Sequence, residues 1–158
     1  MSNMPPALEA IVDDFQSADR QERTEMLIDF AKSLPPLPEK LAAFKDAAHR
    51  VEECQSPIYL FVAVTPDQKV EIHADAPIEA PTVRGFVAIM VEGLNGAPAQ
   101  DVLAVGDDVI ERIGLLEMLG MLRTRGVHGI LRRIKTEVAR ALIANDHTQT
   151  AANSAGIP

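Results

Sequence analysis

The sequence predicts a single α+β domain, in which an antiparallel sheet has helices packed on one side. Three observations lead to this class. Apolar residues recur at helical spacing towards both ends of the chain, residues near the middle form strand-like runs, and the two kinds of pattern are segregated. A chain of 158 residues can bury one sizeable core. We expect the domain to span residues 1–147, followed by a disordered tail at 148–158, where the residues are polar and small.

Two helices are predicted at the start of the chain. The first follows a pair of prolines and spaces its apolar residues helically from Leu8 to Phe15. The second covers residues 20–34 and is stopped by the Pro-Pro-Leu-Pro segment at 35–38, because prolines lack the amide donor. A short helix is expected over residues 41–44.

A β-hairpin is predicted next. Residues 58–65 are β-branched and aromatic and end at a Pro-Asp-Gln-Lys turn, whereas residues 69–74 alternate apolar and polar side chains. The spacing and the turn between them favour antiparallel pairing.

The second half of the chain is predicted to be helical. We expect one helix from Thr82, as its N-cap, to a stop at Gly96, and a short helix that starts at Pro98. A long helix is expected over residues 125–143, with an inner stripe made of Ile130, Ile134, Val138 and Ala141.

Charge and composition exclude several classes of function. A formal net charge of −8 argues against nucleic-acid binding. The longest apolar run is too short for a membrane span, the N-terminus shows no secretory signal, and a single cysteine forms no internal disulfide. We therefore expect a cytoplasmic protein without a membrane or nucleic-acid partner.

Positive charge is concentrated in residues 123–140, which hold a single acid, Glu137. This basic segment is either a solvated helix face or a docking surface for an acidic protein. Its cations are Arg123, Arg125, Arg132, Arg133, Lys135 and Arg140.

The sequence lacks the residues that most metal sites and catalytic sites need. A structural zinc site needs about four nitrogen or sulfur ligands, whereas this chain has one cysteine and four scattered histidines. One thiol is too few for an iron–sulfur cluster, and there is neither a phosphate loop nor a Gly-x-Ser-x-Gly elbow. Cys54 is left as the candidate covalent centre.

Cys54 lies in a polar Glu-Glu-Cys-Gln-Ser-Pro stretch just before the first predicted strand. A lone cysteine is often an inert buried residue, but loops of this kind also present reactive groups. Glu52 and Glu53 should raise the pKa of the thiol. The surroundings favour a thiol that stays unreactive until a partner supplies positive charge or geometry.

The motifs around this cysteine resemble the SufE family, the sulfur acceptors of cysteine desulfurases in iron–sulfur cluster assembly, in an actinobacterial-like form. Cys-Gln-Ser at 54–56 is similar to the family's loop, Arg84-Gly85 to its helix start, and Gly114-Leu115 with Arg123 and Gly126 to a later stretch. A Leu-Pro segment lies upstream, and the resemblance covers roughly residues 8–143.

The chain departs from the family pattern at three places. Glu53 stands where the family usually has glycine, and Gly120-Met121 replaces a Ser-Pro pair. The acids of the helix-start motif, Asp75 and Glu79, are separated by two extra residues.

The resemblance implies a function and a site. Cys54 would take persulfide sulfur from a SufS-like cysteine desulfurase, whose pyridoxal phosphate does the carbon–sulfur chemistry, and pass it to an iron–sulfur scaffold. The chain would hold no cofactor itself and would be a monomer or weak homodimer when alone. The expected partner-binding residues are Gln55, Ser56, Glu79, Arg84, Arg123 and His128.

Three segments of this site are expected to lie near one another: the Cys54 loop, residues 79–84 and residues 123–128. Arg123 is expected to steady the loop, because guanidinium donors suit carbonyls and carboxylates. The alternative function is a binding-only regulator of a desulfurase or another protein, in which Cys54 is a structural thiol.

Overall fold

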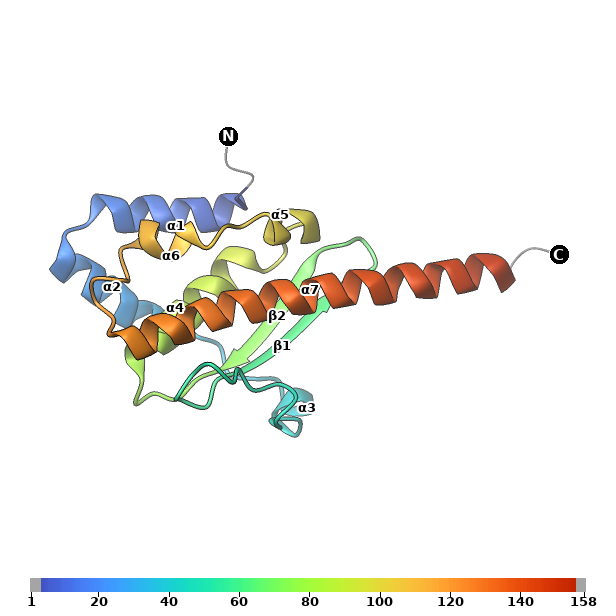
Figure 1. Cartoon of the computed structure of the whole chain (residues 1–158), viewed down its shortest axis with the longest axis horizontal. Coiled ribbons are helices and arrows are strands. Elements are labelled where there is room, and N and C mark those ends of the chain that lie inside the picture. The colour runs from blue at the N-terminus through green and yellow to red at the C-terminus, as the bar shows by residue number, and fades with distance from the viewer. Residues whose placement is uncertain (1–3, 156–158) are drawn as a thin grey trace.

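The computed structural model describes the backbone of residues 4–155 and the side chains of residues 4–146. Helices surround one small sheet (Figure 1). The elements in chain order are α1 (Pro6–Ser17), α2 (Arg20–Ser33), α3 (Glu39–Ala42), β1 (Tyr59–Val64), β2 (Val70–Asp75), α4 (Pro81–Leu94), α5 (Ala99–Leu103), α6 (Asp108–Ile113) and α7 (Met121–Ala155).

The predicted hairpin is confirmed. β1 and β2 pair antiparallel from Tyr59 opposite Asp75 to Val64 opposite Val70. Because side chains alternate along a strand, one face of the hairpin is apolar and packs inward. The inner face is formed by Leu60, Val62, Val64, Val70, Ile72 and Ala74.

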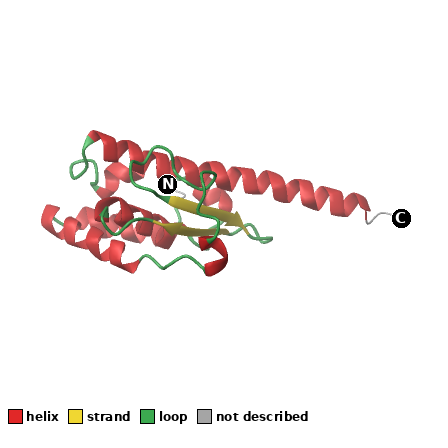
Figure 2. Ribbon diagram, turned by 90° about the horizontal axis from the view of Figure 1, so that it is seen from below, coloured by secondary structure: helices red, strands yellow, loops and turns green. Residues whose placement is uncertain are grey.

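Long helices cover the inner face of the hairpin. α7 packs against β1 and α4 packs against β2, whereas α3 lies by the other face, as Figures 1 and 2 show. The fold is therefore the expected α+β domain, with the long helices on one side of a two-stranded antiparallel sheet.

α4 is the central helix of the core. It contacts α1, α2, β2 and α7, so most of its side chains are buried all round. Gly85 allows the close crossing with α2, since a Cβ there would lie 2.4 Å from the Leu27 carbonyl oxygen. The expected N-cap at Thr82 is wrong: the helix begins at Pro81 after Ala80, because proline is well suited to the first turn.

α7 is longer than expected. It begins at Met121 rather than residue 125, and Ile130, Ile134 and Val138 are fully buried as predicted, while Ala141 is only partly buried. Its far end projects beyond the rest of the fold (Figures 1 and 2).

The helical backbone of α7 also includes residues 148–155, which were expected to be a disordered tail. This stretch is rich in alanine and lacks glycine and proline, so nothing in it stops a helix that is already formed. Residues 156–158 lie outside the described part of the chain. Within that part, no helix combines the length and the apolar character that a membrane crossing needs.

α6 was not predicted. Its six residues bury Val109, Ile110 and Ile113, and it ends at Gly114, whose φ of 83° is in the left-handed region that favours glycine. Leu115, which follows, is fully buried. The Gly-Leu motif of the sequence therefore marks the end of a short helix and its anchor in the core.

Candidate functional site

Cys54 points into the molecule. It is 6% exposed and belongs to the main apolar core, and its thiol donates a weak 3.5 Å hydrogen bond to the Gly126 carbonyl oxygen on α7. The expectation of a polar loop position is therefore wrong for the cysteine itself, although the side chains of Glu53 and Gln55 are exposed.

Two buried residues close the loop around the thiol. Val51 and Ile58 are both fully buried, and the Val51 amide donates to the Ile58 carbonyl oxygen at 2.9 Å. The Cys54 amide donates back to the Val51 carbonyl oxygen at 3.3 Å. These contacts turn the cysteine inward while its charged neighbours stay in water.

The absence of a side chain at Gly126 brings α7 close to the thiol. A Cβ at this position would lie 3.2 Å from the Cys54 sulfur, closer than ordinary van der Waals contact. This glycine belongs to the Arg-x-x-Gly motif seen in the sequence. The structure gives the motif a physical reason, because the helix backbone itself forms one wall of the thiol site.

Arg133 ties the chain before Cys54 to α7. Its guanidinium donates to the carbonyl oxygen of Ala48 and, at 3.4 Å, to that of Arg50. Between them, the His49 carbonyl oxygen accepts from the Leu60 amide at 2.9 Å, which lays this segment along β1. Sequence reasoning missed this role, because Arg133 looked like one cation of a basic face.

Burial makes the thiol a weak acid. It raises the pKa of Cys54 from an ordinary value of 9.0 to about 11, with a further increase from the charge of Glu53 and a smaller opposing effect from Arg50. The sequence predicted the contribution of Glu53 but not the larger effect of burial, and the expected contribution of Glu52 is not among the causes of the raised pKa. At neutral pH the thiol is protonated and therefore a poor nucleophile.

A small cavity of about 100 Å³ opens beside the thiol. It lies between the Cys-Gln-Ser element and the first turns of α4 and α7. The Cys54 loop and residues 123–128 therefore meet here as expected, whereas residues 79–84 contribute only Val83. The lining residues are Cys54, Gln55, Ser56, Val83, Leu122, Arg123 and Gly126.

The surface around this cavity combines apolar, basic and acidic side chains. Met121 is 92% exposed and Leu122 is 60% exposed, at the start of α7. Arg125 lines an adjoining hollow of about 400 Å³ together with Glu52 and Glu53. Exposed large apolar side chains beside a reactive group are typical of a docking surface, and sequence analysis did not select either residue.

Other predicted site residues lie apart from the thiol cavity. The guanidinium of Arg84 donates to the carbonyl oxygens of Ala31, at 2.7 Å, and of Ala76, so it joins the end of α2 to the loop before α4. Glu79 is exposed and lines a different hollow beside Arg84. His128 is half-buried and does not line the cavity.

Arg123 reaches the cavity but does not hold the loop. It is exposed, and among the described residues no hydrogen bond or ion pair joins it to the Cys54 loop. The expected steadying role belongs in this structure to Arg133 and to the Gly126 carbonyl.

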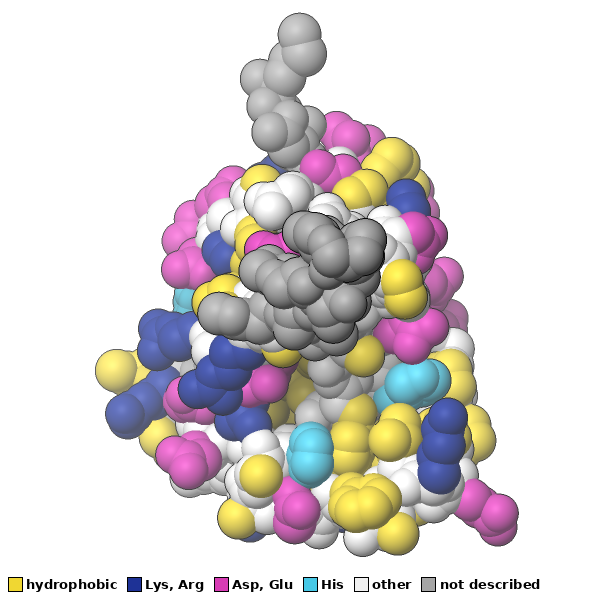
Figure 3. Space-filling view, turned by 90° about the vertical axis from the view of Figure 1, so that its right-hand side faces the viewer, with side chains coloured by type: hydrophobic (Ala, Val, Ile, Leu, Met, Phe, Trp, Pro, Cys, Tyr) yellow, Lys and Arg dark blue, Asp and Glu magenta, His cyan; other side chains and the backbone are white. Residues whose placement is uncertain are grey.

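The cations of the basic segment therefore fall into two groups. Arg133 and Lys135 bind backbone carbonyls, the latter at 2.7 Å from Val105, whereas Arg123, Arg125 and Arg132 are exposed. Figure 3 shows lysine and arginine side chains gathered on one flank of the face seen from the end of α7, with acids spread around it.

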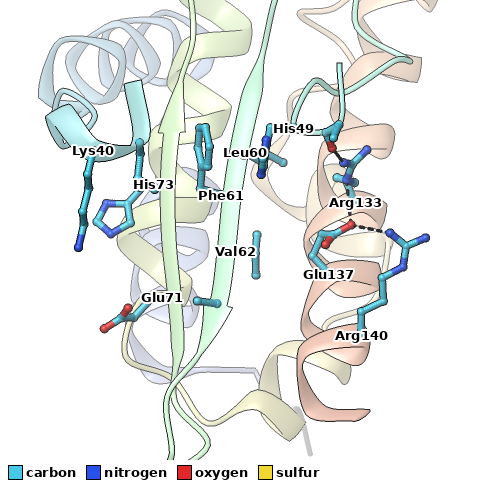
Figure 4. A pocket seen from close by; sticks show the side chains of 13 residues that line it. Lys40, His49, Leu60, Phe61, Val62, Glu71, His73, Arg133, Glu137 and Arg140 are labelled. Carbon is cyan, nitrogen blue, oxygen red and sulfur yellow. Dashed lines mark hydrogen bonds and ion pairs between the residues drawn. The ribbon is translucent and has the colours of Figure 1, made fainter. Parts of the chain in front are cut away.

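A larger hollow of about 540 Å³ lies away from the thiol, between α3, the sheet and α7 (Figure 4). Two of its cations are already engaged, because Glu137 lies 3.2 Å from the Nε of Arg133 and 3.0 Å from Arg140. In the part of the chain with described side chains, no three His, Cys, Asp or Glu residues cluster to bind a metal ion.

Comparison with known proteins places this fold and loop in a family. Residues 9–138 match the family model described as "SufE: Fe-S metabolism associated domain". A SufE-like protein of Mycobacterium tuberculosis is 40% identical over 140 residues, which cover 89% of this chain and 96% of that protein. The cysteine desulfuration protein SufE of Plasmodium falciparum is 30% identical over 141 residues, covering 84% of this chain and 54% of that protein.

A solved structure shows the same architecture. The solution structure of a hypothetical protein from Thermus thermophilus matches with a TM-score of 0.77 and 33% identity, over 89% of this chain and 98% of that one. The family model covers most of the chain, including the thiol loop and the helix start that packs on it. The chain belongs to the SufE family.

Proposed function

We propose that this chain is a sulfur acceptor and activator for a pyridoxal-phosphate-dependent cysteine desulfurase, and that Cys54 carries the sulfur. The observation that supports this most is the position of the only thiol, which lies at a small cavity that exposed Leu122 and Arg123 also line. Membership of a family whose relatives are named for cysteine desulfuration points the same way.

The chemistry is a thiol exchange. The Cys54 thiolate attacks the outer sulfur of the persulfide on the desulfurase, and the bond between the two enzyme-held sulfurs breaks. Cys54 then carries the persulfide, and the cysteine of the desulfurase leaves as a thiolate. One sulfur moves without net oxidation or reduction, and the proton lost by Cys54 is matched by the one that the leaving thiolate takes up.

The resting thiol is poorly prepared for this attack. It is buried and protonated, while displacement at a disulfide-like bond needs an accessible thiolate. Docking must therefore turn the loop outward and favour the thiolate. Exposed Leu122 and Arg123 line the cavity, and exposed Met121 precedes them at the start of α7, so a docked desulfurase would meet these side chains.

The sulfur would then pass to an iron–sulfur scaffold. A persulfide on a carrier with one cysteine cannot be resolved into an internal disulfide, so it persists until a second protein accepts the sulfur. Gln55 and Ser56, which follow Cys54 in the chain and line the cavity, are proposed as partner contacts. Glu79, Arg84 and His128 stay proposals with less support, since they lie outside it.

The burial of Cys54 favours a second candidate, a regulator that binds the desulfurase without carrying sulfur. Turnover assays separate the two: alanine formation by the desulfurase is measured with the wild-type chain and with Cys54→Ser. The carrier account predicts that stimulation disappears with the serine variant although it still binds. Full stimulation by a folded serine variant would support the regulator instead.

A further inference from the structure

The residue before Cys54 packs onto a part of α7 that has no side chain. A Cβ added to Gly129 would lie 2.6 Å from the Glu53 Cβ and 2.9 Å from its Oε2. Carbon atoms in contact are about 3.5–4.0 Å apart, so any side chain at 129 would displace Glu53.

Backbone conformation does not explain this glycine. Gly129 is buried inside α7, and it is not among the glycines with positive φ, which are Gly96 and Gly114. Alanine is a better helix former than glycine at such a position. What the glycine supplies is space for the Glu53 side chain, which lies against the helix there while one side of it stays exposed.

The same strip of the helix holds the thiol. Gly126 lies three residues before Gly129, so both are on one face of α7, with the Cys54 sulfur near the first and Glu53 against the second. Because Glu53 and Cys54 are adjacent in the chain, a shift of Glu53 away from the helix also lifts the cysteine.

We propose that Gly129 and Glu53 are a complementary pair of positioning residues, whose close packing sets the resting place of Cys54 against α7. The purpose of this placement, to keep a sulfur-accepting thiol covered until the desulfurase docks, rests on the proposed function. The packing itself does not, and it can be tested on the free chain.

The test measures the rate of Cys54 alkylation by iodoacetamide in the free chain at one fixed pH. Gly129→Ala should react about tenfold faster than wild type or more, since the lifted thiol is exposed and no longer desolvated. Gly120→Ala is the matched control: it lies just before α7, a Cβ there meets nothing within 4 Å, and the rate should stay unchanged.

Double variants identify the contact. Glu53→Gly removes the colliding side chain, so adding Gly129→Ala to it should change the rate less than twofold. Glu53→Gln keeps the Cβ and loses only the charge, so adding Gly129→Ala to Glu53→Gln should still produce the large increase. This difference separates packing from electrostatics.

Each outcome decides the proposal. An unchanged alkylation rate in folded Gly129→Ala, or an equal increase in the Glu53→Gly background, would overturn it. If Gly129→Ala does not fold, the proposal requires that the double variant with Glu53→Gly does fold, and failure of both to fold would overturn it. Loss of sulfur transfer with these alkylation results intact would overturn only the proposed function.

Discussion

The reactivity of Cys54 is set mainly by where its side chain lies. Burial against α7 and the charge of Glu53 both favour the neutral thiol, and Arg50 opposes them weakly. Of these effects, the sequence could predict that of Glu53, since it is adjacent. The burial depends on Gly126, 72 positions further along the chain, which no local pattern places beside the cysteine.

The pH dependence of alkylation tests this account of the thiol. Only the thiolate reacts, so the rate in the free chain should rise with pH and reach half of its maximum at a pH of about 11, well above 9.0. Glu53→Gln should lower the midpoint, because it removes the neighbouring negative charge but leaves the burial. Glu52→Gln is the matched control and should leave it unchanged; a wild-type midpoint at 9.0 would refute the burial argument.

Cys54→Ser should remain folded but become less stable. The hydroxyl replaces a thiol in an apolar site, where a poorly compensated polar group costs about 1–3 kcal/mol. Chemical denaturation measures this loss, and Cys54→Ala, which has no polar group, provides the comparison. A serine variant as stable as wild type would mean that the site is open to water.

At the scale of elements, most helices and both strands follow from local patterns. The prolines at the start of α1 and the alternation of β2 predicted these two elements well, whereas α3 (Glu39–Ala42) begins and ends two residues before the helix expected over residues 41–44. α6 was missed because a helix of six residues is too short for its apolar spacing to show, and it is held by the burial of Val109, Ile110 and Ile113. The first turn of α7 was missed because residues 121–124 are mostly exposed and show no apolar stripe. The close crossing of α2 and α4 was not predicted either, because a glycine in a helix does not show which residue packs against it.

Gly85→Ala should destabilise the crossing of α2 and α4. A Cβ would meet both the backbone and the side chain of Leu27, at 2.4 and 2.7 Å, so the two helices must separate. Overpacking of this kind costs about 1–3 kcal/mol of unfolding free energy. Thermal or denaturant unfolding measures the effect. An alanine variant at least as stable as wild type would show that the helices are not held at this separation.

At the scale of the whole molecule, the resemblance to a family predicted more of the site than periodicity did. It selected Cys54, Gln55, Ser56 and Arg123, all of which line one cavity. It also selected Arg84, which the structure instead shows bridging backbone carbonyls of two segments. A residue of a family motif can therefore stabilise the fold instead of forming the site, and sequence alone does not separate these two roles.

The distribution of charge yields a prediction about docking. On a chain with net charge −8, Arg123 is an exposed cation beside the thiol cavity, suited to an acidic site on the desulfurase. Arg123→Ala should weaken binding about fivefold at low salt, as for loss of one partly exposed ion pair, and the difference should shrink as salt rises.

Titration calorimetry at two salt concentrations measures this change. Arg140→Ala is the control, because Arg140 lies about 25 Å further along α7 and pairs with Glu137. Equal weakening by both variants would mean that net charge, rather than a contact at Arg123, governs docking.

Mass spectrometry of the chain after incubation with a cysteine desulfurase and cysteine tests the central proposal most directly. The account predicts a mass increase of one sulfur atom on the peptide that contains Cys54, reversed by a thiol reductant and missing in Cys54→Ser. A desulfurase that binds the chain and turns over while Cys54 gains no sulfur would contradict the account.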